Sequence, residues 1–220
     1  AEGYKTKTVI SYSHAEGNNT LTRGIYSHAE GVQTISYGIS SHTEGSQTST
    51  HALASHAEGR LSQASGQFSH AEGNSTQAIG QASHAEGSNT STTGNYSHAE
   101  GRETEANVAY SHAEGWNTVT ARAYQHAQGQ YNTEGNTNSL MVIGNGTANN
   151  NRSDLALFDQ TAITFNADVT ASGVVSASGA LFADIPEDID NSAGNVVVYN
   201  PTTGEFEYTG SYSTDAGEDD

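Results

Sequence analysis

The sequence contains no cysteine, which rules out a disulfide framework and thiol-based chemistry. Charged residues make up 15% of the 220 residues, well below the roughly one quarter typical of soluble domains. No apolar run approaches the ~18 residues of a transmembrane helix, so we expect no membrane insertion. Leucine and isoleucine are scarce, and there is one tryptophan. Order must therefore come from repetition, backbone hydrogen bonds or association with other chains, rather than from a large apolar core.

Basic residues are also few. The chain has seven lysines and arginines against 25 acidic residues, a formal net charge of −18. Nucleic acids and anionic membranes are bound through basic patches, which this composition cannot supply. We therefore expect no nucleic-acid partner.

The dominant feature is an internal repeat, in which histidine returns at every fourteenth position from His14 to His126. Seven of nine copies contain the motif Ser-His-Ala-Glu-Gly, and the last copy carries Gln125 and Gln128 in place of Ser and Glu. The first residues, Ala-Glu-Gly, are the end of such a motif, so we expect the chain to be part of a longer or processed protein. The histidines of the motif form a His column: His14, His28, His42, His56, His70, His84, His98, His112 and His126. The glutamates form a Glu column: Glu16, Glu30, Glu44, Glu58, Glu72, Glu86, Glu100 and Glu114.

This period predicts a parallel β-roll. Helical repeats need roughly 30 or more residues and collagen needs glycine at every third position, whereas a 14-residue period with glycine at two turns fits two short strands per coil. Coils of such a roll stack at about 4.8 Å. Because neighbouring strand residues point to opposite faces, Ser, Ala and Gly of the motif share the inner face. In the second strand, small residues such as Thr20, Thr22 and Gly24 also point inward.

The same alternation places the His and Glu columns on the outside, where they hardly vary from coil to coil. A free surface would not hold such constancy, so we interpret these columns as a contact with a partner chain. Counting one repeat onward from His126 puts Leu140 at the next His position and Val142 at the next Glu position. Aliphatic residues there indicate a buried environment, so both are included in the predicted interface.

The coils resemble the left-handed parallel β-roll of YadA-like trimeric adhesin heads. Residues 138–144, Asn-Ser-Leu-Met-Val-Ile-Gly, are close to the core motif of that family, and Ser-His-Ala-Glu-Gly is similar to a polar variant found in bacterial adhesins and phage tail-fibre or appendage proteins. The resemblance covers residues 1–147 and implies a left-handed roll and a homotrimer of three parallel chains. The His/Glu pair in place of two aliphatic residues departs from the family pattern.

The period ends after residue 147, so residues 148–220 are predicted as a second, β-rich stalk region with an acidic tail. Residues 155–158 and 162–165 have the composition of short strands. Residues 167–180 resemble tail-fibre stalk segments. Residues 196–199 and 205–208 predict a hairpin with its turn at 201–204.

The His and Glu columns allow two chemical interpretations, a metal site and an interface of hydrogen bonds. Imidazoles and carboxylates could bind zinc or nickel, but a metal site usually stands alone with supporting neighbours, whereas this pattern recurs in every coil. We therefore favour an interface of His–Glu hydrogen bonds and expect no metal or cofactor. Ser13, His14 and Glu16 do not predict a hydrolase, because adjacent strand residues point to opposite faces and cannot form a triad.

The same alternation of strand faces decides how the threonine and aromatic positions are interpreted. The threonine rows point inward, which argues against ice binding. The aromatic residues near the end of each coil are expected to cover the corner between coils rather than to stack on glycans. Tyr37, Trp116 and Tyr131 are predicted to lie at variable, exposed positions and are the candidates for ligand contact.

The sequence thus predicts a non-enzymatic, homotrimeric fibre for host attachment, located on a virion or on an extracellular or cell surface. Its expected partners are two further copies of the chain and a glycan or protein receptor. Two alternatives stay open: the passenger head of a bacterial trimeric autotransporter adhesin, and a self-assembling extracellular filament whose His/Glu columns respond to pH or metal.

Overall fold

A computed structural model describes residues 1–167, 196–200 and 205–209. The chain divides into two units, Ala1–Thr170 and Ala171–Asp220. Every regular element in the described residues is a β-strand, as predicted. Those residues include no helix of a length and apolarity suited to crossing a bilayer.

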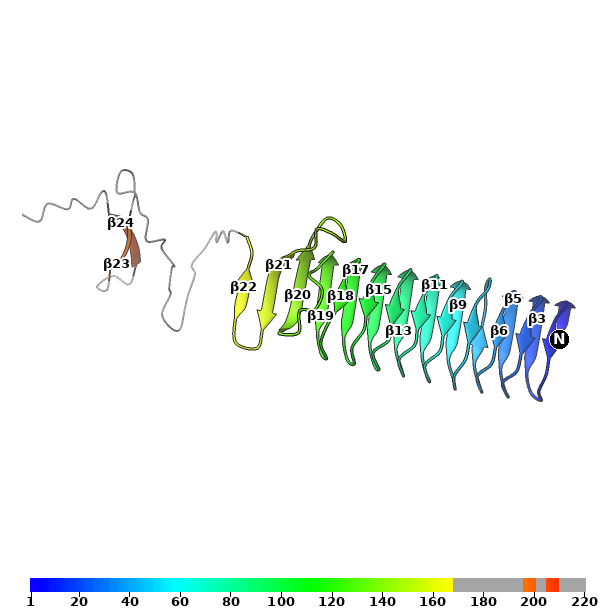
Figure 1. The fold of residues 1–220 in the computed structure, drawn as a ribbon. Coiled ribbons are helices and arrows are strands. Elements are labelled where there is room, and N and C mark those ends of the chain that lie inside the picture. Colours follow the sequence, from blue (N-terminus) through cyan, green and yellow to red (C-terminus); the bar gives the residue numbers. More distant parts are fainter. Residues whose placement is uncertain (168–195, 201–204, 210–220) are drawn as a thin grey trace, which may run out of the picture. The chain divides into compact units, whose positions relative to one another are not determined.

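The first unit is a parallel β-solenoid of about ten turns with coils of about 14 residues (Figure 1). Each coil up to β17 and β18 contributes one strand to each of two sheets. The first sheet contains β1 Glu2–Tyr4, β3 His14–Asn18, β5 His28–Val32, β7 His42–Thr43, β9 His56–Arg60, β11 His70–Asn74, β13 His84–Ser88, β15 His98–Arg102, β17 His112–Trp116, β19 His126–Gln130, β20 Ser139–Asn145, β21 Asp154–Asp159 and β22 Ile163–Phe165. The second sheet contains β2 Lys7–Thr8, β4 Leu21–Thr22, β6 Ile35–Ser36, β8 Ser49–Thr50, β10 Gln63–Ala64, β12 Gln77–Ala78, β14 Ser91–Thr92, β16 Glu105–Ala106 and β18 Val119–Thr120.

Successive coils pair in parallel and in register. In β11 and β13, His70 lies beside His84 and Glu72 beside Glu86. Because the register matches the period of the sequence repeat, each motif position forms a straight column along the solenoid. The predicted two-stranded coil and its parallel stacking are confirmed.

The solenoid interior is narrow and is filled by small side chains. Ala71 and Ala78 are fully buried, and Thr76 lies between them in sequence with no exposed surface. The inward direction predicted for these positions is confirmed. Since no large apolar side chain is buried in these coils, the backbone ladders between coils supply much of the order.

The serine and glycine of the motif shape the coil. Buried Ser69 donates its hydroxyl hydrogen bond to the carbonyl oxygen of Gly66, three residues earlier, at 2.7 Å. Gly73 has a φ of +112°, and a Cβ atom built on it would overlap the carbonyl oxygen of Gly87 in the next coil. The serine therefore closes one corner, and the glycine lets two backbones approach closely at the other.

The register of the last coil differs from the sequence prediction. His126 pairs with Met141 and Gln128 pairs with Ile143, so the step from His126 to Met141 is longer than the repeat by one position. From Met141 onward the extra residue places each side chain on the strand face opposite to the predicted one. The assignment of Leu140 and Val142 to the outward columns is therefore wrong.

Val142 lies in register with Ala127 and is fully buried, and Leu140 is exposed one position before the His column. Met141 and Ile143 continue the His and Glu columns and are half-buried.

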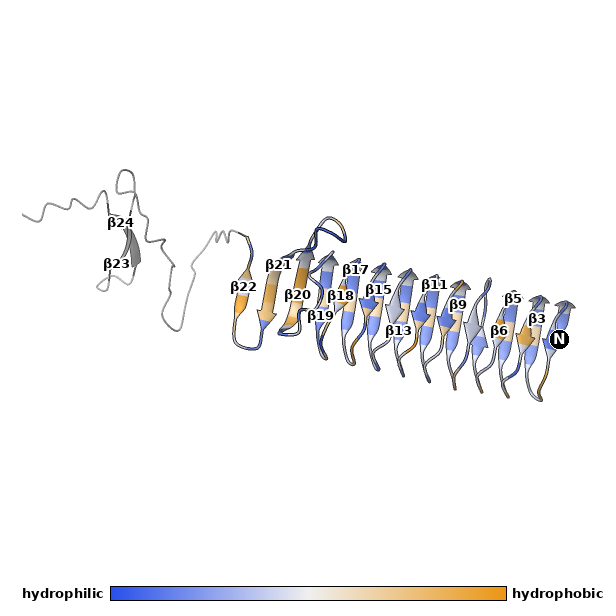
Figure 2. Cartoon of the chain, viewed as in Figure 1, coloured by the Kyte–Doolittle hydropathy of each residue, from blue (hydrophilic) through white to orange (hydrophobic). Residues whose placement is uncertain are grey.

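Beyond the parallel coils the sheet continues with antiparallel strands. β20 pairs with β21 and β21 with β22, which confirms the strands predicted at 155–158 and 162–165. The loss of the repeat at residue 147 is thus a change of strand direction within one sheet. Figure 2 shows the apolar colour concentrated in β20, β21 and β22, whereas the earlier coils are mostly polar.

The second unit contains the predicted hairpin. β23 Val196–Asn200 pairs antiparallel with β24 Glu205–Thr209. The predicted turn at 201–204 and the segment 168–180 lie outside the described residues.

A polar cap closes the parallel stack. The guanidinium of Arg152 donates to the carbonyl oxygens of Asn117 and Asn132 at 2.9 and 3.1 Å and pairs with Glu134 at 2.8 Å. Gln125, which is fully buried where other coils have serine, donates to the carbonyl oxygen of Ser139 at 2.8 Å. Both side chains therefore donate hydrogen bonds to backbone carbonyl groups at the end of the parallel stack.

We expect Arg152→Ala to destabilise the solenoid by about 1–3 kcal/mol, because it leaves partly buried carbonyl groups without a donor. Arg60→Ala, at an exposed arginine within the repeat, is the control and should change stability little. Chemical unfolding of both variants measures the difference. Equal losses in the two variants would contradict the assignment of Arg152 as a cap.

Candidate functional site

The His column is a continuous stack of imidazole rings. Consecutive ring centroids lie 4.6–5.1 Å apart from His14 to His126. From His28 onward the ring planes are parallel within 8°. The spacing follows directly from the stacking of the strands that carry the rings.

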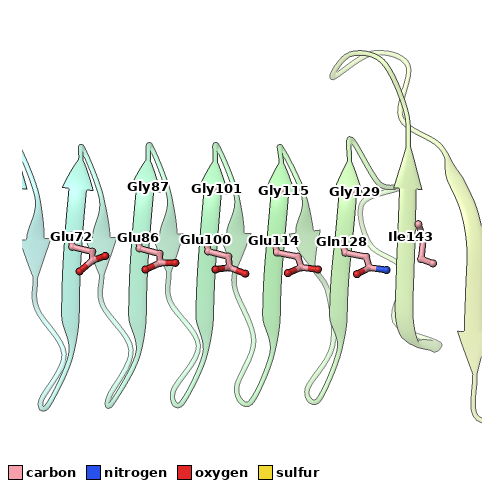
Figure 3. A pocket seen from close by; sticks show the side chains of 10 residues that line it. All are labelled: Glu72, Glu86, Gly87, Glu100, Gly101, Glu114, Gly115, Gln128, Gly129 and Ile143. Carbon is pink, nitrogen blue, oxygen red and sulfur yellow. The ribbon is translucent and has the colours of Figure 1, made fainter.

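The Glu column lies two residues further along the same strands. Figure 3 shows the side chains of Glu72, Glu86 and Glu100 projecting to one side from successive strands. Together with the glycines that follow them they line a shallow, open groove. The groove ends at Gln128 and Ile143, where the carboxylates give way to an amide and then to an aliphatic side chain.

Each described carboxylate of the column lies close to an imidazole. The Nε2 atom of His70 is 3.6 Å from a carboxylate oxygen of Glu72 in the same coil. Near the end of the stack Glu100 approaches His112 of the next coil instead, at 3.5 Å. The glutamates therefore stand beside two consecutive rings.

These approaches are not hydrogen bonds. Among the described residues, eight buried Nε2 atoms have no hydrogen-bond partner. They belong to His28, His42, His56, His70, His84, His98, His112 and His126. The expected His–Glu hydrogen bonds are thus not formed within one chain. The side chains themselves remain about one third exposed, as in His70 and Glu72 at 34% and 35%.

Four histidines of the column are biased toward the neutral form. Burial is the largest cause that lowers the pKa of His56, His70, His84 and His112 below the ordinary value, and neighbouring imidazoles lower it further. A strong charge-assisted pairing with the carboxylates is therefore disfavoured at neutral pH.

The glutamates interact with one another. Hydrogen bonding to Glu100, followed by burial, raises the pKa of Glu86 to about 7. The same hydrogen bond lowers the pKa of Glu100, which indicates a proton held on Glu86. Burial, then the charge of Glu44, raises the pKa of Glu58. At Glu58 and Glu86, close carboxylates thus favour the protonated form and reduce the local charge.

These pKa directions predict a pH-dependent effect of Glu86→Gln. A raised folded-state pKa gives stability that is complete below the ordinary pKa of 4.5 and is lost as the pH rises to about 7. Glutamine cannot ionise, so the variant should melt about 2–4 °C above the unmodified chain at about pH 8 and no higher at about pH 4.

Melting curves in a metal-chelating buffer measure this effect. Glu105→Gln, on an exposed position of β16, is the control and should show no such pH dependence. A Glu86→Gln gain that is the same at both pH values would contradict the proton assignment.

The candidate ligand-contact residues have different environments. Tyr37 is 37% exposed, stacks on His51 at 5.0 Å and lies under the guanidinium of Arg23. Trp116 is 40% exposed, with Arg102 over its ring. Both remain accessible.

The prediction that Tyr131 is exposed is wrong. Its side chain is 8% exposed and packs against Trp116, with Arg152 over its ring. The cause is the turn that follows β20, because Ser153 donates its backbone hydrogen bond to the carbonyl oxygen of Tyr131 and brings the cap over it.

The other aromatic residues mark a corner of the coil. Tyr96, Tyr110 and Tyr124 have φ values near +60° and stack on one another at 5.1–5.2 Å. Their rings are at least half exposed, but stacking covers the ring faces that a sugar would use. The corner position agrees with the prediction.

Sequence reasoning missed Met141 and Ile143 as members of the columns. The signal that identifies them is Gly144, which pairs with Gly129. Alignment on the motif glycine, rather than on a fixed count from the last histidine, gives the correct register.

Comparison with known proteins adds no further assignment: no family model, no curated protein and no solved structure matches the chain. The columns, their spacing and their unpartnered nitrogen atoms are therefore the basis for the functional proposals.

Proposed function

We propose that the chain is one of three identical subunits of a host-attachment fibre. Three parallel, left-handed solenoids pack with their His and Glu columns facing one another. The fibre belongs to a virion or to an extracellular or cell surface, and it works by presenting a rigid surface rather than by catalysis.

One observation carries the proposal: the outward columns are constant, whereas other outward positions vary. Positions next to each other in the second sheet hold Leu21, Ile35 and Ser49, but the column position holds histidine in every parallel coil up to His126. At the end of the stack the columns continue as half-buried Met141, which suits a surface that a partner covers.

The flanks support a role in attachment. A trimer that covers the columns leaves the variable sides of each solenoid accessible. Tyr37 and Trp116 are exposed there beside arginine side chains. Aromatic and arginine side chains together form contacts with glycan or protein receptors.

The mass of the full chain in solution tests the assembly. Light scattering coupled to size-exclusion chromatography should give three times the chain mass of 23.0 kDa. A mass of one chain would overturn the proposed packing of the columns. Binding of the intact protein to host cells, compared with Tyr37→Ala and Trp116→Ala variants, then tests attachment.

A further inference from the structure

We propose that the His and Glu columns bind divalent transition-metal ions, with zinc as the representative ion. Each ion is held by the Nε2 atoms of two consecutive histidines and by a carboxylate oxygen of the glutamate beside them. All three ligands come from one chain, so this proposal does not rest on the trimer.

The donor atoms are already gathered. One imidazole nitrogen each from His56 and His70 and one carboxylate oxygen of Glu58 lie within 4.8 Å of one another, and the same arrangement recurs along the stack. Two imidazoles and one carboxylate are a common donor set for zinc, in which a fourth position stays open to water. Nitrogen-rich donors of this kind favour zinc, nickel and copper over magnesium and calcium.

The second observation is that the buried Nε2 atoms of the His column lack hydrogen-bond partners in the part of the chain that the structure describes. A buried Nε2 atom without a hydrogen-bond partner loses its interaction with water and gains nothing in return. Among the described residues this occurs in eight coils, and in seven of them the same Nε2 atom lies 3.4–3.9 Å from a carboxylate oxygen of the Glu column. A metal ion would satisfy two of these nitrogen atoms at once. Sequence periodicity alone could not reveal this feature.

The stacking sets the number of ions. Zinc–nitrogen bonds are about 2.0–2.1 Å long, so two Nε2 atoms on one ion must lie closer together than the coil spacing. Rotation of two neighbouring side chains toward each other supplies this approach and moves each ring away from its other neighbour. Each Nε2 atom also offers a single lone pair. Eight such histidines therefore form four separate pairs, and we expect up to four ions per chain.

Isothermal titration of the full chain with zinc, after removal of metal by a chelator, measures this number. Titration with cobalt provides a spectroscopic check, because nitrogen and oxygen ligands in tetrahedral geometry give strong visible absorption. We expect about four ions per chain. No zinc binding by the folded chain would overturn the proposal.

Two variants with the same composition distinguish paired sites from independent ones. Each replaces four histidines by glutamine. The interleaved variant changes His28, His56, His84 and His112. The block variant changes His28, His42, His56 and His70. The first leaves no two consecutive histidines anywhere in the column, whereas the second leaves His84, His98, His112 and His126 in sequence.

We expect the interleaved variant to lose all paired-site binding and the block variant to keep about two ions per chain. Equal stoichiometry in both would show that single histidines or exposed carboxylates bind the metal, and would overturn the proposal. Circular dichroism checks that both variants fold, and the block variant provides the test if the other does not. The mass in the presence of chelator separates the two proposals, because a metal-free trimer supports the interface whether or not zinc binds.

Discussion

Gly73→Ala is expected to be among the most destabilising single substitutions in the solenoid. Gly73 has a φ of +112°, a conformation that costs an L-residue about 1–3 kcal/mol. Its new Cβ would also overlap the backbone carbonyl of Gly87 in the next coil, and overpacking of this kind costs about 1–3 kcal/mol more. The two effects add because the strand cannot shift without breaking its ladder to β13.

The measurement is chemical unfolding of the variant, with an expected loss of about 2–6 kcal/mol from the two effects together. Gly135→Ala is the matched control, since Gly135 also has a positive φ, +75°, but a Cβ there would meet nothing within 4 Å. It should lose only the conformational part. A Gly73→Ala loss no larger than that of Gly135→Ala would contradict the proposed close approach of the coils.

The residues found at the two glycine positions of the repeat agree with the large effect expected for Gly73→Ala. The motif glycine is present in every parallel coil, from Gly3 to Gly129. The second glycine position, which lies shortly before the next histidine, is occupied by other residues in several coils, Ala52 and Val108 among them. Those two residues have ordinary φ values, so a side chain there requires a local shift rather than a forbidden conformation.

Most of the solenoid could be predicted because its rules are local and repeated. Strand alternation alone places His70 outside and Ala71 inside, and the period of the repeat fixes which residues stack. The same reasoning failed where the repetition changes. One added residue between Gly129 and Gly144 turned Val142 inward and removed Leu140 from the His column, and a one-residue slip changes faces in this way in any strand.

The geometry of the His and Glu columns could not be predicted, because interatomic distances and atom burial cannot be obtained from the sequence. The motif predicted that His and Glu would face the same side, but not that the Nε2 atoms would be buried and yet 3.4–3.9 Å from the carboxylates. The burial of Tyr131 was also out of reach, because residues 145–153 cover it through tertiary contacts. Handedness, the number of chains and the stalk stay predictions.

A second large effect, dissociation of the proposed trimer, is expected from negative charges placed in the His column. The double variant His70→Glu, His84→Glu puts new carboxylates between Glu72 and Glu86 and those of the other two chains. Two like charges about 4 Å apart repel by about 1 kcal/mol in water and about 4 kcal/mol near a protein surface, and the repulsion recurs in all three chains. We expect the protein to dissociate, so that its mass falls to that of one 23.0-kDa chain.

The control is Gln63→Glu, Gln77→Glu. These residues also stack on each other in neighbouring coils, in β10 and β12, but on the second sheet and away from the columns. The two new carboxylates therefore repel each other similarly in the two double variants, but only in the column variant do they also lie beside the Glu column, that of the same chain and those of the other chains. The control should keep the mass of three chains, measured by light scattering near neutral pH in the presence of chelator. If both variants stay trimeric, the columns do not face one another, and a different side of the solenoid must form the contact.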